Sequence, residues 1–153
     1  MKKYLVLALC LLMVTIGHAQ NYTEYFADKT LRIDYIFTGN AARQNVCLDE
    51  LSVLPSWAGR RHHLAELPLQ GNGQIIMKDL ESGKTIYTTS FSSLFQEWLE
   101  TDEAKAVTKG FENTFLLPYP LRPVEIEITL LSPSPAEELP LPWTHPVVGE
   151  ESG

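Results

Sequence analysis

The sequence reads VEIEITLL from Val124 to Leu131, and this stretch alternates apolar and polar residues along most of its length. Val124, Ile126, Ile128 and Leu130 fall on one face, and Glu125, Glu127 and Thr129 fall on the other. A period of two is typical of a β-strand that buries one face and exposes the other. The stretch Thr30–Gly39 repeats the pattern: Leu31, Ile33, Tyr35 and Phe37 lie opposite Arg32 and Asp34, and the turn pair Gly39-Asn40 ends it.

Four further stretches favour strands and one favours a helix. The strand candidates are Val46–Leu51, which is the weakest, Gln74–Leu80, Thr85–Phe91, and a run that carries Phe111, Phe115 and Leu117. The second and third flank a turn that contains Gly83, which predicts a hairpin. Leu94–Lys105 has helical spacing of apolar residues, and Ser93 with Gln96 matches a capping box. The sequence therefore predicts a mostly β protein, an antiparallel β-sandwich with one short helix. A small barrel is the main competing fold.

The two ends of the chain differ from this pattern. Met1–Ala19 combines Lys2 and Lys3, an apolar run too short to span a membrane, and small residues before Gln20. We interpret it as a cleavable signal peptide, so export to the periplasm or outside the cell is expected. The folded domain is predicted over residues 20–131. Residues 132–153 hold five prolines and two acidic pairs, which predicts an extended or disordered tail.

Composition and cysteine content exclude some classes of function. The formal net charge is −7, and cleavage after Ala19 would remove two lysines and make it more negative. An acidic surface argues against binding to nucleic acid and, after signal cleavage, to membranes. Cys47 would be the only cysteine of the mature chain, so no internal disulfide is expected. A lone cysteine in an apolar strand pattern is usually a small buried side chain.

The strongest polar cluster is Arg60-Arg61-His62-His63, followed by Glu66. His63 and Glu66 have the spacing of two metal ligands on one face of a helix. Neither H-E-x-x-H nor its inverted form occurs in the chain, because Leu67 stands where the inverted motif needs a histidine. No other motif brings together a nucleophile, a base and an oxyanion donor. We therefore expect no catalytic residue, no metal site and no cofactor.

Several longer stretches carry a resemblance to a known family. They are Leu31–Gly39 (LRIDYIFTG), Trp57–His63 (WAGRRHH), Leu67–Gly73 (LPLQGNG), Ser90–Trp98 (SFSSLFQEW) and Phe111–Pro118 (FENTFLLP). In this order they resemble the N-terminal domain of the IgA peptidase family of secreted bacterial zinc metallopeptidases, metallopeptidase family sixty-four. The resemblance covers roughly Tyr22–Leu131.

The resemblance implies a β-sandwich followed by a separate catalytic domain that holds the zinc-binding H-E-x-x-H helix. No position here matches that motif, so we expect the catalytic domain to be missing from this chain. The unusual tail from Ser132 suggests a truncated or frame-shifted gene product.

The leading hypothesis for the function is a non-catalytic accessory domain of a secreted metallopeptidase-like protein. It would pack against a catalytic domain or help to present a protein or glycan substrate. The expected contact residues are Trp57, Arg60, Arg61, His62 and His63. Two alternatives stay open at this point: a free-standing exported module that binds glycan or protein through Trp57, Tyr119 and Trp143, and a chain that is itself a peptidase.

Overall fold

A computed structural model describes residues 21–67, 71–130 and 143–147. The predicted signal peptide Met1–Ala19 lies outside these residues. The strands are β1 (Phe26–Asn40), β2 (Arg43–Pro55), β3 (Gly73–Asp79), β4 (Thr85–Phe91), β5 (Lys109–Pro120), β6 (Val124–Leu130) and β7 (Trp143–Val147). The helical elements are α2 (Tyr22–Tyr25), α3 (Leu94–Leu99) and the 3₁₀ turn η1 (Glu103–Lys105).

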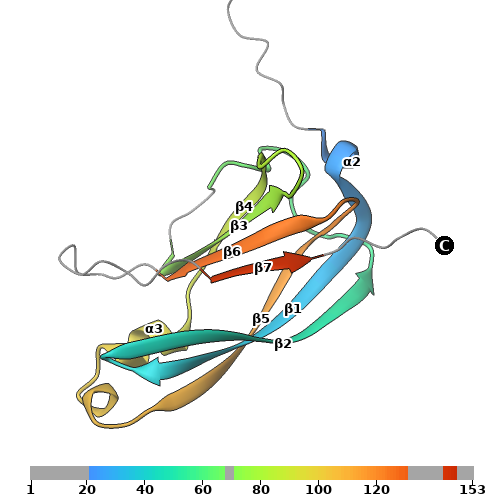
Figure 1. Ribbon diagram of the computed structural model, residues 1–153. Helices are drawn as coiled ribbons and strands as arrows, with labels where there is room; N and C mark the ends of the chain where they lie inside the picture. The colour runs from blue at the N-terminus through green and yellow to red at the C-terminus, as the bar shows by residue number, and fades with distance from the viewer. Residues whose placement is uncertain (1–20, 68–70, 131–142, 148–153) are drawn as a thin grey trace, which may run out of the picture.

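The strands form two antiparallel sheets (Figure 1). Sheet A has three strands in the order β2-β1-β5, and sheet B has four in the order β4-β3-β6-β7. The predicted hairpin is formed by β3 and β4, and the predicted strand at Val124 is β6. The mostly β, antiparallel, sandwich-like fold predicted from the sequence is confirmed.

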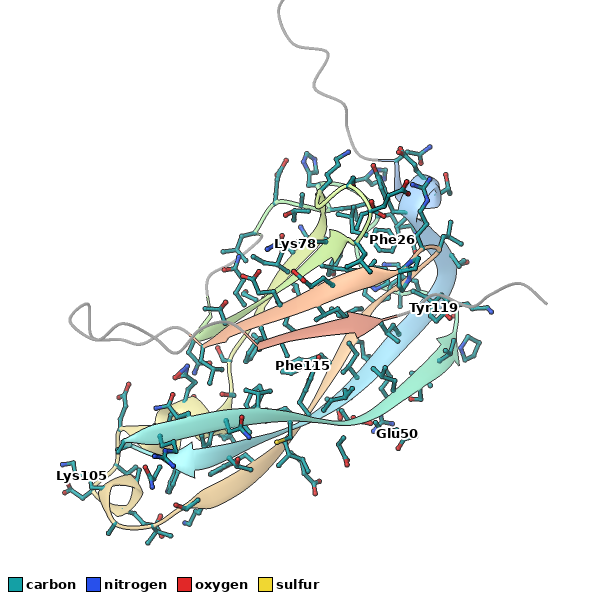
Figure 2. All side chains as sticks on the ribbon, viewed as in Figure 1. Phe26, Glu50, Lys78, Lys105, Phe115 and Tyr119 are labelled. Carbon is teal, nitrogen blue, oxygen red and sulfur yellow. The ribbon has the colours of Figure 1, made fainter. Side chains whose placement is uncertain are left out.

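The core lies between the sheets and is built on the apolar face of β1. Leu31, Ile33, Tyr35 and Phe37 are each at most 3% exposed. Phe37 has Phe91, Phe95 and Phe115 around it at centroid distances of 6.0–6.1 Å. Figure 2 shows Phe115 directed into the space between the sheets. Strand β1, which has a partner strand on each side, thus supplies the centre of the packing.

Strand β2 contains a β-bulge at Asp49 that the sequence pattern did not reveal. The register shifts between Asp34 and Tyr35 of β1, so that Glu50 pairs with Asp34 and Leu48 pairs with Tyr35. The extra residue leaves Val46, Leu48, Leu51 and Val53 on the face that β1 buries, although Leu48 and Leu51 are an odd number of residues apart. This break in alternation explains why β2 is the weakest strand candidate in the sequence.

The predicted helix is present but short. The side chain of Ser93 accepts a hydrogen bond from the backbone N–H of Gln96, as the capping box predicts. Helix α3 ends at Leu99, and the chain continues into η1 instead of a longer helix. The indole N–H of Trp98 donates to Glu103 at 2.9 Å, which joins the two pieces. The helical stretch predicted over Leu94–Lys105 is therefore two separate turns of helix.

Two expectations need correction. Cys47 is exposed, because it lies on the outer face of β2 opposite Ile36 rather than in the core. Within the tail predicted over 132–153, Trp143–Val147 form strand β7, which pairs with β6. The domain therefore extends past residue 131. Pro146 is tolerated there because β7 is an edge strand, with β6 as its one neighbour among the described strands. The rest of the tail lies outside the described residues.

The packing around Phe37 gives the first prediction. Phe37→Ala should lower the free energy of unfolding by about 3–5 kcal/mol, because it opens a cavity among three other aromatic rings. Leu116→Ala is the control, since Leu116 is 52% exposed and its loss should cost about 0.5 kcal/mol or less. Urea unfolding followed by tryptophan fluorescence measures both. Similar losses in the two variants would contradict the assigned core.

Candidate functional site

The loop Ser56–Leu67, which follows β2, contains all five residues predicted to contact a partner. Its first anchor is Trp57, which is 8% exposed. The backbone N–H of Trp57 donates to Asp28 at 3.0 Å, and its indole N–H donates to the carbonyl of Arg60 at 3.0 Å. The ring meets Tyr87 of β4 edge-on at 6.2 Å. Trp57 is therefore a core residue and presents little surface to a partner.

Arg60 holds the loop closed. Its guanidinium donates to the backbone carbonyls of His63 and Glu66 at 2.6 and 2.7 Å and to that of Leu64 at 3.1 Å. It also donates to the carbonyl of Thr88 in β4 and lies 5.0 Å from the centre of the Tyr87 ring. The five N–H donors of arginine suit this role, because one planar group satisfies several carbonyls of a non-helical segment. The Arg60 guanidinium is thus used for hydrogen bonds within the domain.

Arg61 points the other way, toward the start of β1. One of its nitrogens lies 2.6 Å from a carboxylate oxygen of Asp28 and donates to the carbonyl of Trp57 at 2.9 Å. Its guanidinium also lies 4.7 Å from the centre of the Tyr22 ring. The Trp57 N–H and then Arg61 lower the pKa of Asp28, since both stabilise the carboxylate. The Arg61 side chain keeps 40% of its surface exposed.

His62 and His63 lie on the surface of the loop. His63 has a left-handed backbone, with φ at 53°, and its Nδ1 lies 2.9 Å from Glu66 Oε1. The segment is a turn rather than the helix that the i, i+3 spacing suggested. In the parts of the chain that the structure describes, no group of three or more histidine, cysteine, aspartate and glutamate residues lies close enough to hold a metal ion.

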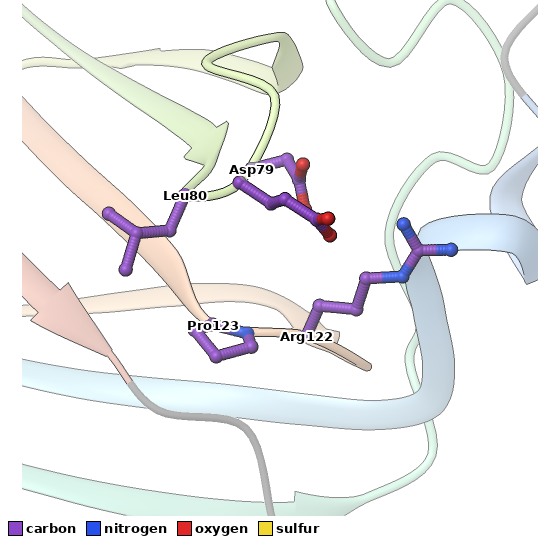
Figure 3. Close-up of a pocket in the computed structure, with 5 residues that line it drawn as sticks. Asp79, Leu80, Arg122 and Pro123 are labelled. Carbon is purple, nitrogen blue, oxygen red and sulfur yellow. The ribbon is translucent and has the colours of Figure 1, made fainter.

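An open cavity of about 490 Å³ lies at one end of the sandwich, where the β3–β4 turn meets the start of β6 (Figure 3). Asp79, Leu80, Glu81, Arg122 and Pro123 line it. Asp79 is only 2% exposed and accepts hydrogen bonds from the backbone N–H and hydroxyl of Ser82. These bonds lower the pKa of Asp79, and they stabilise the β3–β4 turn. No sequence motif pointed to this cavity.

The structure also bears on the predicted glycan anchors. Trp57 is 8% and Tyr119 is 9% exposed, so neither offers a ring for stacking against a sugar. Trp143 is in β7, and its side chain lies outside what the structure describes. None of the helices in the described residues is long and apolar enough to cross a membrane.

The different positions of the two arginines give a prediction about stability. Arg60→Ala should lower the free energy of unfolding by about 2–3 kcal/mol, because several loop carbonyls lose their donor. Arg60→Lys should recover only part of this, since an ammonium cannot reproduce the planar set of donors. Arg61→Ala should cost about 1 kcal/mol or less, because its ion pair is largely exposed. Urea unfolding of the three variants tests the order; equal losses at 60 and 61 would contradict it.

The lowered pKa of Asp28 predicts how stability depends on pH. A carboxylate with a lower pKa in the folded state stabilises the protein above its unfolded pKa, near about 3.9, and loses this contribution as the pH falls through the folded pKa. Asp28→Asn should therefore be less stable than the parent chain between about pH 5 and 7, and the gap should close below about pH 4. Thermal unfolding across this range measures the gap. A difference that stays constant with pH would refute the assignment.

Comparison with known proteins agrees with this architecture. A family model described as the peptidase M64 N-terminus matches residues 21–137, which is most of the chain. A search of curated proteins found no match. The matched residues include every described element except β7, so the resemblance inferred from the sequence motifs is confirmed over the folded domain. The chain belongs to the peptidase M64 N-terminal domain family.

Proposed function

We propose that this chain is a non-catalytic N-terminal accessory domain of a secreted IgA-peptidase-like zinc metallopeptidase. The match of residues 21–137 to the M64 N-terminus carries the proposal. Its role is to pack against the catalytic domain or to present a protein or glycan substrate to it. The predicted signal peptide Met1–Ala19 supports export of the chain to the periplasm or beyond.

The chemistry of the described side chains supports a non-catalytic role. A catalytic zinc is usually held by three protein ligands and needs a general base nearby. The full sequence has four histidines: His18 is in the predicted signal peptide, His62 and His63 are adjacent in an exposed turn, and His145 is in β7. Two charged groups that could serve a site, Arg60 and Asp79, instead form hydrogen bonds with the backbone of their own domain.

The loop Ser56–Leu67 remains a proposed contact region, with its roles now divided. Trp57 is buried and Arg60 donates to carbonyls of the loop, so both shape the loop from within. His62 and His63 are exposed, and the Arg61 side chain keeps 40% of its surface exposed. Charged and polar groups of this kind typically form the rim of an interface and fix its register.

The proposal predicts binding without hydrolysis. The mature chain, residues 20–153, should bind a separately expressed M64 catalytic domain in isothermal titration calorimetry, with saturable heat at micromolar concentrations. An unrelated secreted zinc peptidase is the control and should give no heat of binding. The mature chain alone should not cleave immunoglobulin or casein.

Either of two results contradicts the proposal. One is the absence of binding to the M64 catalytic domain, which removes the accessory role. The other is proteolysis by the purified mature chain that a chelator abolishes, which would make the chain itself the peptidase.

A further inference from the structure

Strand β2 carries an apolar row that sheet B leaves partly uncovered. Leu48, Leu51 and Val53 are 37%, 40% and 48% exposed. Their neighbours across the ladder on β1 are Tyr35, Ile33 and Leu31, which are at most 3% exposed. Cross-strand partners point to the same face of a sheet. The face that is fully buried on β1 is therefore open to solvent one strand further out, on the edge of sheet A.

The row lies on the face of sheet A that is directed toward sheet B, and this face is buried on β1. The opposite, outer face of sheet A combines polar groups with the exposed Leu54 and Leu116. On it Arg32 pairs with Asp34 at 3.0 Å, and Thr114 donates to Asp34. Glu50 also lies on that outer face, beside Asp34 (Figure 2). The bulge at Asp49 is what keeps Leu48 on the same face as Leu51. Apolar side chains gathered on one partly open face, rimmed by polar residues, mark an interaction surface.

The edge of β2 is protected against pairing with another strand. The bulge at Asp49, the carboxylates of Asp49 and Glu50, and Pro55 at the strand end all interrupt a continuous ladder. A partner therefore binds by packing side chains onto the row rather than by extending the sheet. This argues against a second copy of the chain joined edge to edge.

The position of the last described strand, β7, indicates which partner could contact the row. Strand β7 ends at Val147, opposite Val124 at the start of β6. Val124 follows closely after Pro120, which pairs with Phe26 at the start of β1. Strand β2 finishes at this same end, where Pro55 pairs with Lys29. Figure 1 shows β7 pointing toward the side on which β2 ends. Polypeptide C-terminal to Val147 thus begins at the end of the sandwich where the row is most exposed.

We propose that Leu48, Leu51 and Val53 form the surface on which the catalytic part of the M64 peptidase docks. This rests on the proposed function and assigns the interface within it. The family match identifies the domain as the N-terminal part of a peptidase, so the catalytic part of such a peptidase lies C-terminal to this domain. The complementary surface on the catalytic part is apolar at its centre, because it packs against the Leu48, Leu51 and Val53 side chains.

A matched pair of variants tests the assignment. Leu51→Gln should weaken binding to a separately expressed M64 catalytic domain about tenfold or more, because it places an amide in the centre of the row. Leu116→Gln is the control and should change the dissociation constant less than twofold. Leu116 is 52% exposed and lies on the outer face of β5, at the other edge of the same sheet. Circular dichroism checks that both variants are folded.

A second measurement uses the unmodified chain and does not depend on the folding of a variant. Hydrogen–deuterium exchange should show that the backbone amides of residues 46–54 become protected when the catalytic domain is added. Strand β5, at the opposite edge of sheet A, is the comparison segment and should gain no protection.

The outcomes separate the interface from the function. If the parent chain binds and Leu51→Gln binds equally well, with no protection over residues 46–54, the β2 surface is wrong and the accessory function stands. If the parent chain does not bind, the β2 surface and the accessory function are both refuted. If sedimentation shows a dimer of the parent chain that Leu51→Gln dissolves, the occupant is a second copy and the inference is overturned.

Discussion

Strand β1 pairs with β2 on one side and with β5 on the other, and its apolar face fills the space between the two sheets. Every other part of the fold is arranged around that buried face. Helix α3 places Phe95 against Phe37, and β4 and β5 bring Phe91 and Phe115 to the same ring. The loop after β2 also contacts the start of β1, because Trp57 and Arg61 both donate hydrogen bonds to Asp28. The two-residue period of β1 is thus the constraint on which the other elements depend.

The cationic side chains of the loop Ser56–Leu67 divide between structure and surface. Arg60 and Arg61 are adjacent in the sequence, yet one turns inward to the carbonyls of the loop and β4 while the other turns toward Asp28. A guanidinium that bonds to carbonyls of its own chain is desolvated by protein groups and has few donors left for a partner. The distinction matters for any attempt to map binding by alanine substitution, because loss of binding on removing Arg60 would report a distorted loop.

Much of the fold could be predicted because the faces of β1, β3 and β6 alternate along the sequence and because Ser93 and Gln96 lie close together in it. The bulge at Asp49 could not, since it depends on how β2 registers against β1. Cys47 was expected to be buried, but that same register puts it on the outer face. Strand β7 was not evident in the sequence because Pro146 argues against a strand, although an edge position tolerates it. The role of Arg60 was hidden because its partner Thr88 is far away in the sequence and is contacted through a backbone carbonyl that no side-chain pattern records.

The pairing of β1 with β5 has a consequence for the order in which the molecule acquires its structure. Sheet A needs a strand from near the start of the chain and one that comes after the whole β3–β4 hairpin and α3. Closing so large a segment of chain is slow, because the entropy of the intervening polypeptide is lost before the contacts form. Until β5 has been synthesised, β1 lacks its second partner strand and sheet A is incomplete. The core between the two sheets is therefore complete only after the residues of β5 have joined β1.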